Sequence, residues 1–271
     1  MPRVIAIANQ KGGVGKTTTA VNLSACLGTI GKRVLLIDMD AQANCTSGLG
    51  HEKTPNASLY PVLLGERKLE NQIVKTEFEG ISLIPSEFDL CAAEVELARL
   101  SFETAGTKSQ KKSDRHLTWL KDALAPVTKR DDYDGILSDC PPSLGKLTLS
   151  VLIAADGILI PLQCEYYPLE GISSITDLMD QLKTSGVNKG LELIGVLMTM
   201  FDSRTNLSRL VVGEVREHFG DKVFRTVIPR ATRVAEAPSH GKPILHYDPY
   251  SAGSASYEVA ALELVKRLGL D

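Results

Sequence analysis

The chain has 271 residues, of which 43% are hydrophobic and 23% charged, with a formal net charge of −3. This length and composition fit one large α/β domain, and the acidic balance excludes a protein that binds nucleic acid through a globally basic surface. No signal segment and no apolar run of about 18–20 residues is present, so we expect a cytoplasmic protein. The cysteines form no C-x-x-C pair, which argues against a disulfide framework, a zinc site or an iron–sulfur cluster: Cys26, Cys45, Cys91, Cys140 and Cys164.

The first predicted elements are a strand, a glycine-rich loop and a helix. An apolar run over residues 4–8 precedes Lys-Gly-Gly-Val-Gly-Lys-Thr-Thr, and a helical pattern then continues to about residue 30. Glycines let backbone N–H groups approach a polyphosphate, and the helix N-terminus favours its negative charge. Lys16 adds positive charge, and the Thr17 hydroxyl can ligate Mg²⁺. The predicted nucleotide-binding residues of this loop are Gly12, Gly13, Val14, Gly15, Lys16, Thr17 and Thr18.

This loop departs from the common pattern G-x-x-x-x-G-K-[ST]. Gln10 stands where glycine is expected, and a second lysine, Lys11, precedes Lys16. One lysine is enough to hold the β- and γ-phosphates, so Lys11 is either a solvated surface residue or has a separate role. The sequence of this loop resembles the deviant Walker A motif of the ParA/MinD ATPases. The resemblance implies catalytic roles for both lysines, with Lys11 reaching across a dimer interface to the phosphates of the partner subunit.

The next apolar run, over residues 33–38, predicts a strand buried on both faces of a parallel sheet. It ends in Asp38-Met39-Asp40, and the period of two places both carboxylates on the same side. Two carboxylates beside a phosphate loop are costly unless they hold a cation or a water, although one could instead cap the next element. By resemblance this is the Walker A′ motif, in which Asp40 orients the attacking water and Asp38 helps to hold the Mg²⁺ shell.

The following segments contain a third strand, over residues 81–84, and a helix to residue 100. Residues 101–115 are rich in Ser, Thr and basic side chains, so we predict an exposed basic loop that is either solvated or touches DNA. A strand over residues 135–139 then ends at Asp139 and is followed by Pro-Pro. An aspartate at a buried strand end is typical of a Walker B motif, whose carboxylate meets magnesium through water.

Three more strands are predicted over residues 157–161, 193–198 and 223–228, with helical spacing between them. The alternation predicts a doubly wound, mostly parallel α/β sheet with helices on both faces, in a single domain over residues 1–271. Ligands are expected at the carboxyl ends of the strands. The resemblance implies adenine contacts at the ends of the last two strands, from Met200, Pro229 and Arg230.

A basic region lies between Phe201 and Arg233, where seven Lys or Arg residues stand against four acidic ones. Ordinary surface helices show such fluctuations, but the spelling resembles the chromosomal ParA (Soj) pattern. The resemblance implies that Arg204 and Arg233 bind DNA phosphates without reading sequence. Tyr250 and Ala252 stand where close relatives often carry arginines, so this chain binds DNA more weakly than they do or uses the 101–115 loop to compensate.

The resemblance covers essentially the whole chain and implies a nucleotide-timed switch. ATP and Mg²⁺ hold two subunits in a homodimer, which binds non-specific double-stranded DNA. A ParB-like centromere-binding protein stimulates a weak Mg²⁺-dependent ATPase, and the resulting monomers release the DNA. The protein is then expected in the cytoplasm, associated with the nucleoid and with no membrane partner.

Two other functions on the same fold remain as alternatives. A MinD-like division-site ATPase needs a basic amphipathic tail, whereas the last predicted helix, residues 257–268, carries only Lys266 and Arg267 beside its apolar face. That face is predicted to comprise Val259, Leu262, Val265 and Leu268. A small-molecule ligase or kinase should show extra catalytic groups, but none of the five histidines has a recognised catalytic spelling.

Overall fold

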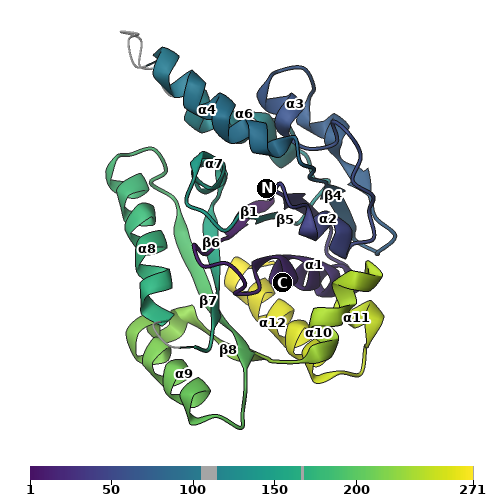
Figure 1. Ribbon diagram of the computed structural model, residues 1–271, viewed down its shortest axis with the longest axis vertical. Helices are drawn as coiled ribbons and strands as arrows, with labels where there is room; N and C mark the ends of the chain where they lie inside the picture. The colour runs from purple at the N-terminus through teal and green to yellow at the C-terminus, as the bar shows by residue number, and fades with distance from the viewer. Residues whose placement is uncertain (105–114, 166–167, 271) are drawn as a thin grey trace.

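An eight-stranded sheet forms the centre of the computed structural model, which describes residues 1–104, 115–165 and 168–270 (Figure 1). The spatial order is β3-β4-β2-β5-β1-β6-β7-β8, and only the β3–β4 pair of this sheet is antiparallel. This confirms the predicted doubly wound, mostly parallel α/β sheet. The strands are β1 (Arg3–Ile7), β2 (Val34–Asp38), β3 (Val74–Lys75), β4 (Ile81–Ile84), β5 (Gly135–Asp139), β6 (Gly157–Gln163), β7 (Glu192–Phe201) and β8 (Val223–Pro229).

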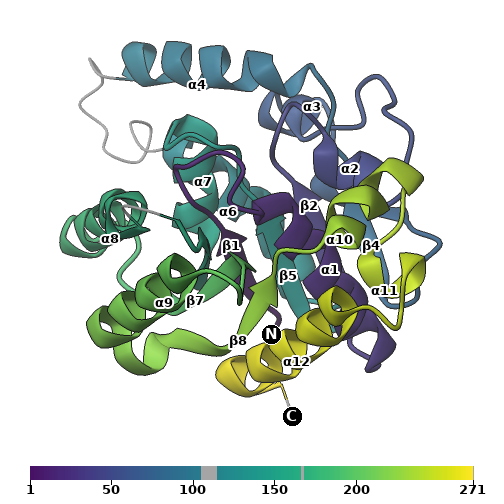
Figure 2. The same ribbon diagram turned by 60° about the horizontal axis from the view of Figure 1, so that its bottom comes forward.

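Helices cover both faces of the sheet (Figures 1 and 2). One face carries α1 (Lys16–Thr29), α2 (Asn44–Gly48), α10 (Thr232–Glu236), the short η3 turn (Ala237–His240), α11 (Ile244–Tyr247) and α12 (Ala252–Leu268). The other face carries α3 (Tyr60–Leu63), α4 (Leu90–Thr104), α6 (Arg115–Thr128), α7 (Lys146–Ala154), α8 (Pro168–Thr184) and α9 (Asn206–Phe219).

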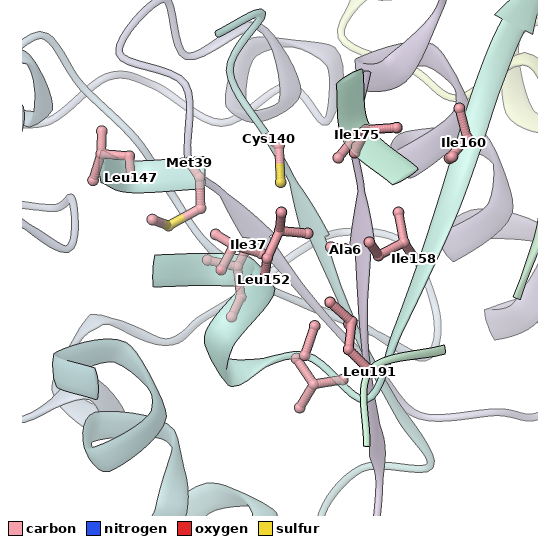
Figure 3. Packing of buried hydrophobic residues seen from close by; sticks show 14 of the residues in the cluster. Ala6, Ile37, Met39, Cys140, Leu147, Leu152, Ile158, Ile160, Ile175 and Leu191 are labelled. Atoms are coloured by element: carbon pink, nitrogen blue, oxygen red, sulfur yellow. The ribbon is translucent and has the colours of Figure 1, made fainter. Parts of the chain in front are cut away.

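The central strands are mostly apolar because most of their side chains pack against one of these two helical layers. In β1, Ile5 and Ile7 belong to the cluster under α1 and α12, whereas Ala6 belongs to the opposite cluster. Figure 3 shows part of that opposite cluster, where Ala6 lies near Ile158 of β6. Burying one Leu or Ile side chain contributes about 1.5–3 kcal/mol, so the two layers together hold the strand ends in fixed positions.

The predicted loop over residues 101–115 was too wide. The helix α4 continues to Thr104, and α6 begins at Arg115. Ser101 favoured a loop, but it lies in the last turn of α4, where its hydroxyl donates to the Ala98 carbonyl of the same helix. The basic side chains of Lys108, Lys111 and Lys112 lie outside the described residues.

The C-terminal helix α12 packs on α1 and β8 with a face that only partly matches the predicted one. Val265 and Leu268 are buried as predicted, with Tyr257 and Leu264 beside them, but Val259 and Leu262 are exposed. The predicted face used a spacing of three residues, which drifts around a helix that has 3.6 residues per turn. Within the described ranges, no helix is long and apolar enough to cross a bilayer.

Candidate nucleotide-binding site

The site lies where β1, β5 and β2 end side by side. Both β1 and β2 pair with β5, and the β2–β5 register sets Asp38 directly opposite Asp139. The loop after β1 leads into α1 at the same edge (Figure 1). The sheet order therefore brings together the three motifs that the sequence separates.

The phosphate loop adopts a conformation that requires glycine. Gly13 and Gly15 have φ values of +73° and +88°, in the left-handed region that other residues rarely adopt. Gly15 also precedes the first residue of α1, and no side chain caps this helix end. The first N–H groups of α1 are thus left for an anion, as a phosphate-binding loop requires.

Two side chains that sequence reasoning missed anchor this loop. Asn9 accepts a hydrogen bond from the Lys11 N–H (3.0 Å) and donates to the Pro161 carbonyl (2.8 Å). The Thr199 hydroxyl donates to the Val14 carbonyl (2.8 Å) from β7. Asn9 is the residue before the motif and could have been suspected, but nothing in the local sequence links Thr199 to residue 14.

The two loop lysines have different surroundings. Lys16 is only 7% exposed, and its ammonium donates to the Lys11 carbonyl (3.1 Å). Burial lowers the pKa of Lys16, and the nearby Asp139 carboxylate partly offsets this. The Lys11 side chain is 51% exposed, and its ammonium lies 3.6 Å from a Glu165 carboxylate oxygen. An exposed pair of this kind is weak, so Lys11 remains free to exchange partners.

Asp139 has the properties of a magnesium-binding carboxylate. It is fully buried, and neither carboxylate oxygen has a hydrogen-bond partner among the described residues. Burial raises the pKa of Asp139 well above its usual value and the Asp38 charge raises it further, whereas Thr17 and Lys16 lower it. Unused carboxylate oxygens beside a threonine hydroxyl suit Mg²⁺ bound with phosphates, so these residues fit the ion.

Asp38 is held differently. Its Oδ2 accepts hydrogen bonds from the Thr46 N–H (2.8 Å) and hydroxyl (2.7 Å), and its Oδ1 accepts from the Asp40 N–H (3.2 Å). Burial raises the pKa of Asp38 to about 6, although the bonds from Thr46 lower it. Both oxygens are therefore already engaged within the chain, and a magnesium role for Asp38 stays a prediction, as does water orientation by Asp40.

An apolar cavity of about 280 Å³ opens beside the phosphate loop. The three predicted adenine contacts, Met200, Pro229 and Arg230, all line this cavity. Tyr257 of α12 also lines it, and sequence reasoning missed this residue. Met200 has a φ of +52°, a strained value for a residue with a side chain, and such strain concentrates at functional sites. The Arg230 N–H donates to the Phe201 carbonyl (2.9 Å), which ties the ends of β7 and β8 together.

The two predicted DNA-binding arginines are paired with acids of their own chain. Arg204, whose side chain is 86% exposed, donates to both Asp202 oxygens (2.9 and 2.8 Å) and holds the pKa of Asp202 down at about 2. Arg233, 60% exposed, donates to Glu236 (3.1 Å) and lies 3.6 Å from Asp248. DNA binding by either arginine stays a prediction.

Comparison with known proteins decides the family. A family model described as an AAA domain matches residues 2–193. The chain is 47% identical over 266 residues to the chromosome partitioning protein ParA of Caulobacter vibrioides, covering 98% of this chain and 94% of that protein. It is also 47% identical over 270 residues to the sporulation initiation inhibitor protein Soj of Bacillus subtilis, covering 99% and 98%. The chain belongs to the ParA/Soj family of partitioning ATPases. The resemblance inferred from the motifs is thereby confirmed.

A solved structure extends the comparison to a bound nucleotide. Cobyrinic acid a,c-diamide synthase from Mycobacterium smegmatis, with bound ADP and magnesium, matches with a TM-score of 0.80 and 35% identity, covering 99% of this chain and 96% of that one. In this ParA/Soj chain, the phosphate loop, Asp139 and the apolar cavity lie together at one edge of the sheet. Arg204 lies after β7 and Arg233 in α10, and neither arginine lines the cavity.

Proposed function

We propose that this ParA/Soj chain is an ATP-driven DNA-partitioning switch. ATP with Mg²⁺ holds two copies in a nucleotide-sandwich homodimer, which binds non-specific double-stranded DNA on the nucleoid. A ParB-like partner stimulates hydrolysis, and the monomers release the DNA. The observation that carries this proposal is the buried Lys16 and the unpartnered Asp139 carboxylate beside one glycine loop, next to an apolar cavity that suits a base.

The residues of the chain divide the chemistry among them. Lys16 and the N–H groups at the start of α1 bind the phosphates, while Thr17 and Asp139 hold Mg²⁺, which neutralises charge that develops on the γ-phosphate. Asp40 orients a water in line with that phosphorus. The water oxygen forms a new bond to phosphorus as the bond to the β-phosphate oxygen breaks, giving ADP and inorganic phosphate.

Dimerisation gives Lys11 its separate role. Its exposed ammonium exchanges the weak contact with Glu165 for the phosphates bound by the partner subunit. A phosphate group carries more charge than one carboxylate, so the exchange favours the ATP-bound dimer. The ATP-bound dimer then presents Arg204 and Arg233 from two chains, which raises affinity for the repeating charge of a DNA backbone.

DNA binding in ATP and in ADP, at two salt concentrations, tests the proposal. With wild-type protein we expect binding to non-specific duplex DNA in ATP, less at the higher salt, and little in ADP. Arg233→Glu should weaken binding in ATP by about tenfold or more, because it replaces phosphate attraction by repulsion. Arg130→Glu is the matched control, since Arg130 is similarly exposed and also paired, with Glu70, but follows α6 at the amino end of β5.

Three results would contradict parts of this proposal. Equal DNA binding in ATP and ADP would rule out a nucleotide switch. A wild-type chain that forms ATP-dependent dimers without binding DNA would point to another cargo surface. Equal losses in Arg233→Glu and Arg130→Glu would show a general charge effect and exclude a binding face at α10.

A small-molecule ligase is the second candidate, favoured by the similarity to the diamide synthase. Such an enzyme couples ATP cleavage to an acceptor, whereas a switch hydrolyses ATP with water alone. Release of phosphate from ATP by the purified chain, with DNA but no acceptor, therefore separates the two. Absence of phosphate release under those conditions would favour the ligase.

A further inference from the structure

The segment after β2 carries Asp40 into a strained turn. Ala43 has a φ of +53°, in the left-handed region that is unfavourable for a residue with a side chain. The turn is closed by the Ala43 N–H, which donates to the Asp40 carbonyl (2.8 Å), and by the Gln42 N–H, which donates to Asp40 Oδ1 (2.9 Å). Such a conformation persists only where the surrounding structure holds it in place.

Thr46, which lies inside α2, helps to hold this turn through hydrogen bonds to Asp38. It is fully buried, and both its N–H and its hydroxyl donate to one oxygen of Asp38, at 2.8 and 2.7 Å. The other oxygen of Asp38 accepts the Asp40 N–H. The Asp38 carboxylate therefore links Thr46 on one side to the backbone of Asp40 on the other.

The Thr46 hydroxyl is itself fixed by a second bond. Its oxygen accepts the N–H of Ser86 (2.9 Å), two residues beyond the end of β4. A hydroxyl has one hydrogen to donate, so accepting from Ser86 leaves that hydrogen directed at Asp38. The strand β4 pairs with β2 up to Ile37 and Ile84, which brings the segment that contains Ser86 beside the end of β2. Only Ser and Thr, at this position, offer both a donor and an acceptor so close to the backbone.

We propose that Thr46 is a positioning residue for ATP hydrolysis, acting through Asp38 to hold Asp40 in its water-orienting place. The inference rests on the proposed ATPase function. The Thr46 hydroxyl bonds to Asp38 and Ser86, and Thr46 does not line the base cavity, so we expect it to align the attacking group without contributing to nucleotide affinity. Asp38 is then the middle residue of this chain of hydrogen bonds, and this is its main role, whether or not it also helps to hold the metal.

Steady-state ATP hydrolysis by Thr46→Val tests this role. Valine has nearly the same shape, but it removes the hydroxyl bond to Asp38 and leaves the Ser86 N–H without its acceptor, while the backbone N–H bond to Asp38 remains. We expect kcat to fall by about tenfold or more with KM for ATP within about twofold, because a small misplacement of a catalytic group slows chemistry without weakening binding. Thr46→Ser keeps the hydroxyl and should recover most of kcat.

Ser150→Ala is the control. Ser150 in α7 is also buried, and its hydroxyl both accepts from the Trp119 indole N–H (2.8 Å) and donates to the Lys146 carbonyl (2.8 Å). Both variants therefore lose a buried hydroxyl that accepts and donates, but only Thr46→Val loosens Asp38. The control should retain wild-type kcat.

Amide hydrogen exchange of the nucleotide-free proteins gives a readout that does not depend on activity. In Thr46→Val, residues 39–47 and the Ser86 amide should exchange faster than in wild type, with the rest of the sheet unchanged. In Ser150→Ala these segments should keep their wild-type rates. The measurement also detects a variant that fails to fold, since protection would then be lost throughout the chain.

The possible outcomes separate this inference from the function on which it rests. If wild type releases no phosphate from ATP, the proposed function fails first. If wild type is active and Thr46→Val keeps its kcat, or if KM rises as kcat falls, the positioning role is wrong. Loss of kcat in Thr46→Ser equal to that in Thr46→Val would also overturn it, because the hydroxyl would then not be what matters.

Discussion

The phosphate-loop edge and the two exposed arginines, Arg204 and Arg233, use charge in opposite ways. At the edge, Lys16 and Asp139 are buried, and Asp139 has no hydrogen-bond partner among the described residues. On the surface, Arg204 and Arg233 are exposed, yet each is paired with an acid of its own chain. Buried charges left without partners are costly for the folded protein and strongly favour a ligand that completes them.

The exposed ion pairs of Arg204 and Arg233 behave differently from the buried charges. Water already solvates an exposed arginine, so its pairing with Asp202 or Glu236 contributes little to stability and is easily exchanged. A DNA phosphate gains from counterion release as well as from direct contact, so it can displace such an acid. In the proposed switch, the edge would therefore hold one tight ligand, and the exposed arginines a ligand that binds and dissociates.

Asp139→Asn should give the largest effect and tests the edge directly. We expect ATPase activity to fall by about 100-fold or more, because the carboxylate that fits Mg²⁺ is lost. The free energy of unfolding of the nucleotide-free protein at pH 7 should instead rise by about 1–3 kcal/mol, because a disfavoured buried acid is replaced by a neutral group. Urea unfolding and phosphate release measure the two. A variant that is both inactive and less stable would break the comparison.

Glu236→Gln should have an intermediate effect, on the surface. Glutamine keeps a hydrogen-bond acceptor for Arg233 but removes the competing charge. We expect DNA affinity in ATP to rise by about two- to fivefold at low salt, and less at high salt. Glu192→Gln, at the pair that Glu192 makes with Arg3, is the control and should leave affinity unchanged. Weaker DNA binding in Glu236→Gln would mean that the acid orients Arg233 and does not compete for it.

Asp89→Asn should give the smallest effect on stability. The direction in which its stability changes with pH tests whether burial or an ion pair sets the pKa of an acid. Burial, with a smaller contribution from Glu87, raises the pKa of Asp89 to about 6, although the hydrogen bond from the Ser58 hydroxyl lowers it. The folded chain therefore binds more protons than the unfolded chain between about pH 4 and 6, and wild-type stability falls as pH rises through this window. Asp89→Asn lacks this loss of stability. Its free energy of unfolding should therefore exceed that of wild type by an amount that grows up to pH 6 and stays below about 1 kcal/mol, because the site is partly exposed.

Asp202→Asn is the counterpart to that measurement. Arg204 lowers the pKa of Asp202 to about 2, so the stabilisation by this pair is present above about pH 4 and lost as pH falls through 2. The variant should be slightly less stable than wild type at neutral pH, with the difference vanishing in acid. The same sign for Asp89→Asn and Asp202→Asn in urea unfolding would contradict the contrast between the two acids.

The sequence by itself determined the strands, the phosphate loop and the family. Apolar runs bounded by turns predicted β4 and β5 with their observed bounds, and the spacing of Gly13, Gly15 and Lys16 predicted the loop. These features are local, because a buried strand and a left-handed glycine leave their mark within a few residues. The full-length similarity to ParA and Soj proteins agrees with the motifs.

Only the tertiary structure decided which distant residues complete the site. Thr199 fastens residue 14 from β7, Thr46 holds Asp38 from α2, and Tyr257 lines the base cavity from α12. No local pattern identifies them, since a threonine in a strand or a tyrosine in a helix is equally compatible with a plain core position. It was also the structure that paired Arg204 and Arg233 with acids and exposed Val259 of α12. Side-chain partners depend on which elements pack together, and that depends on the sum of many weak contacts across the sheet.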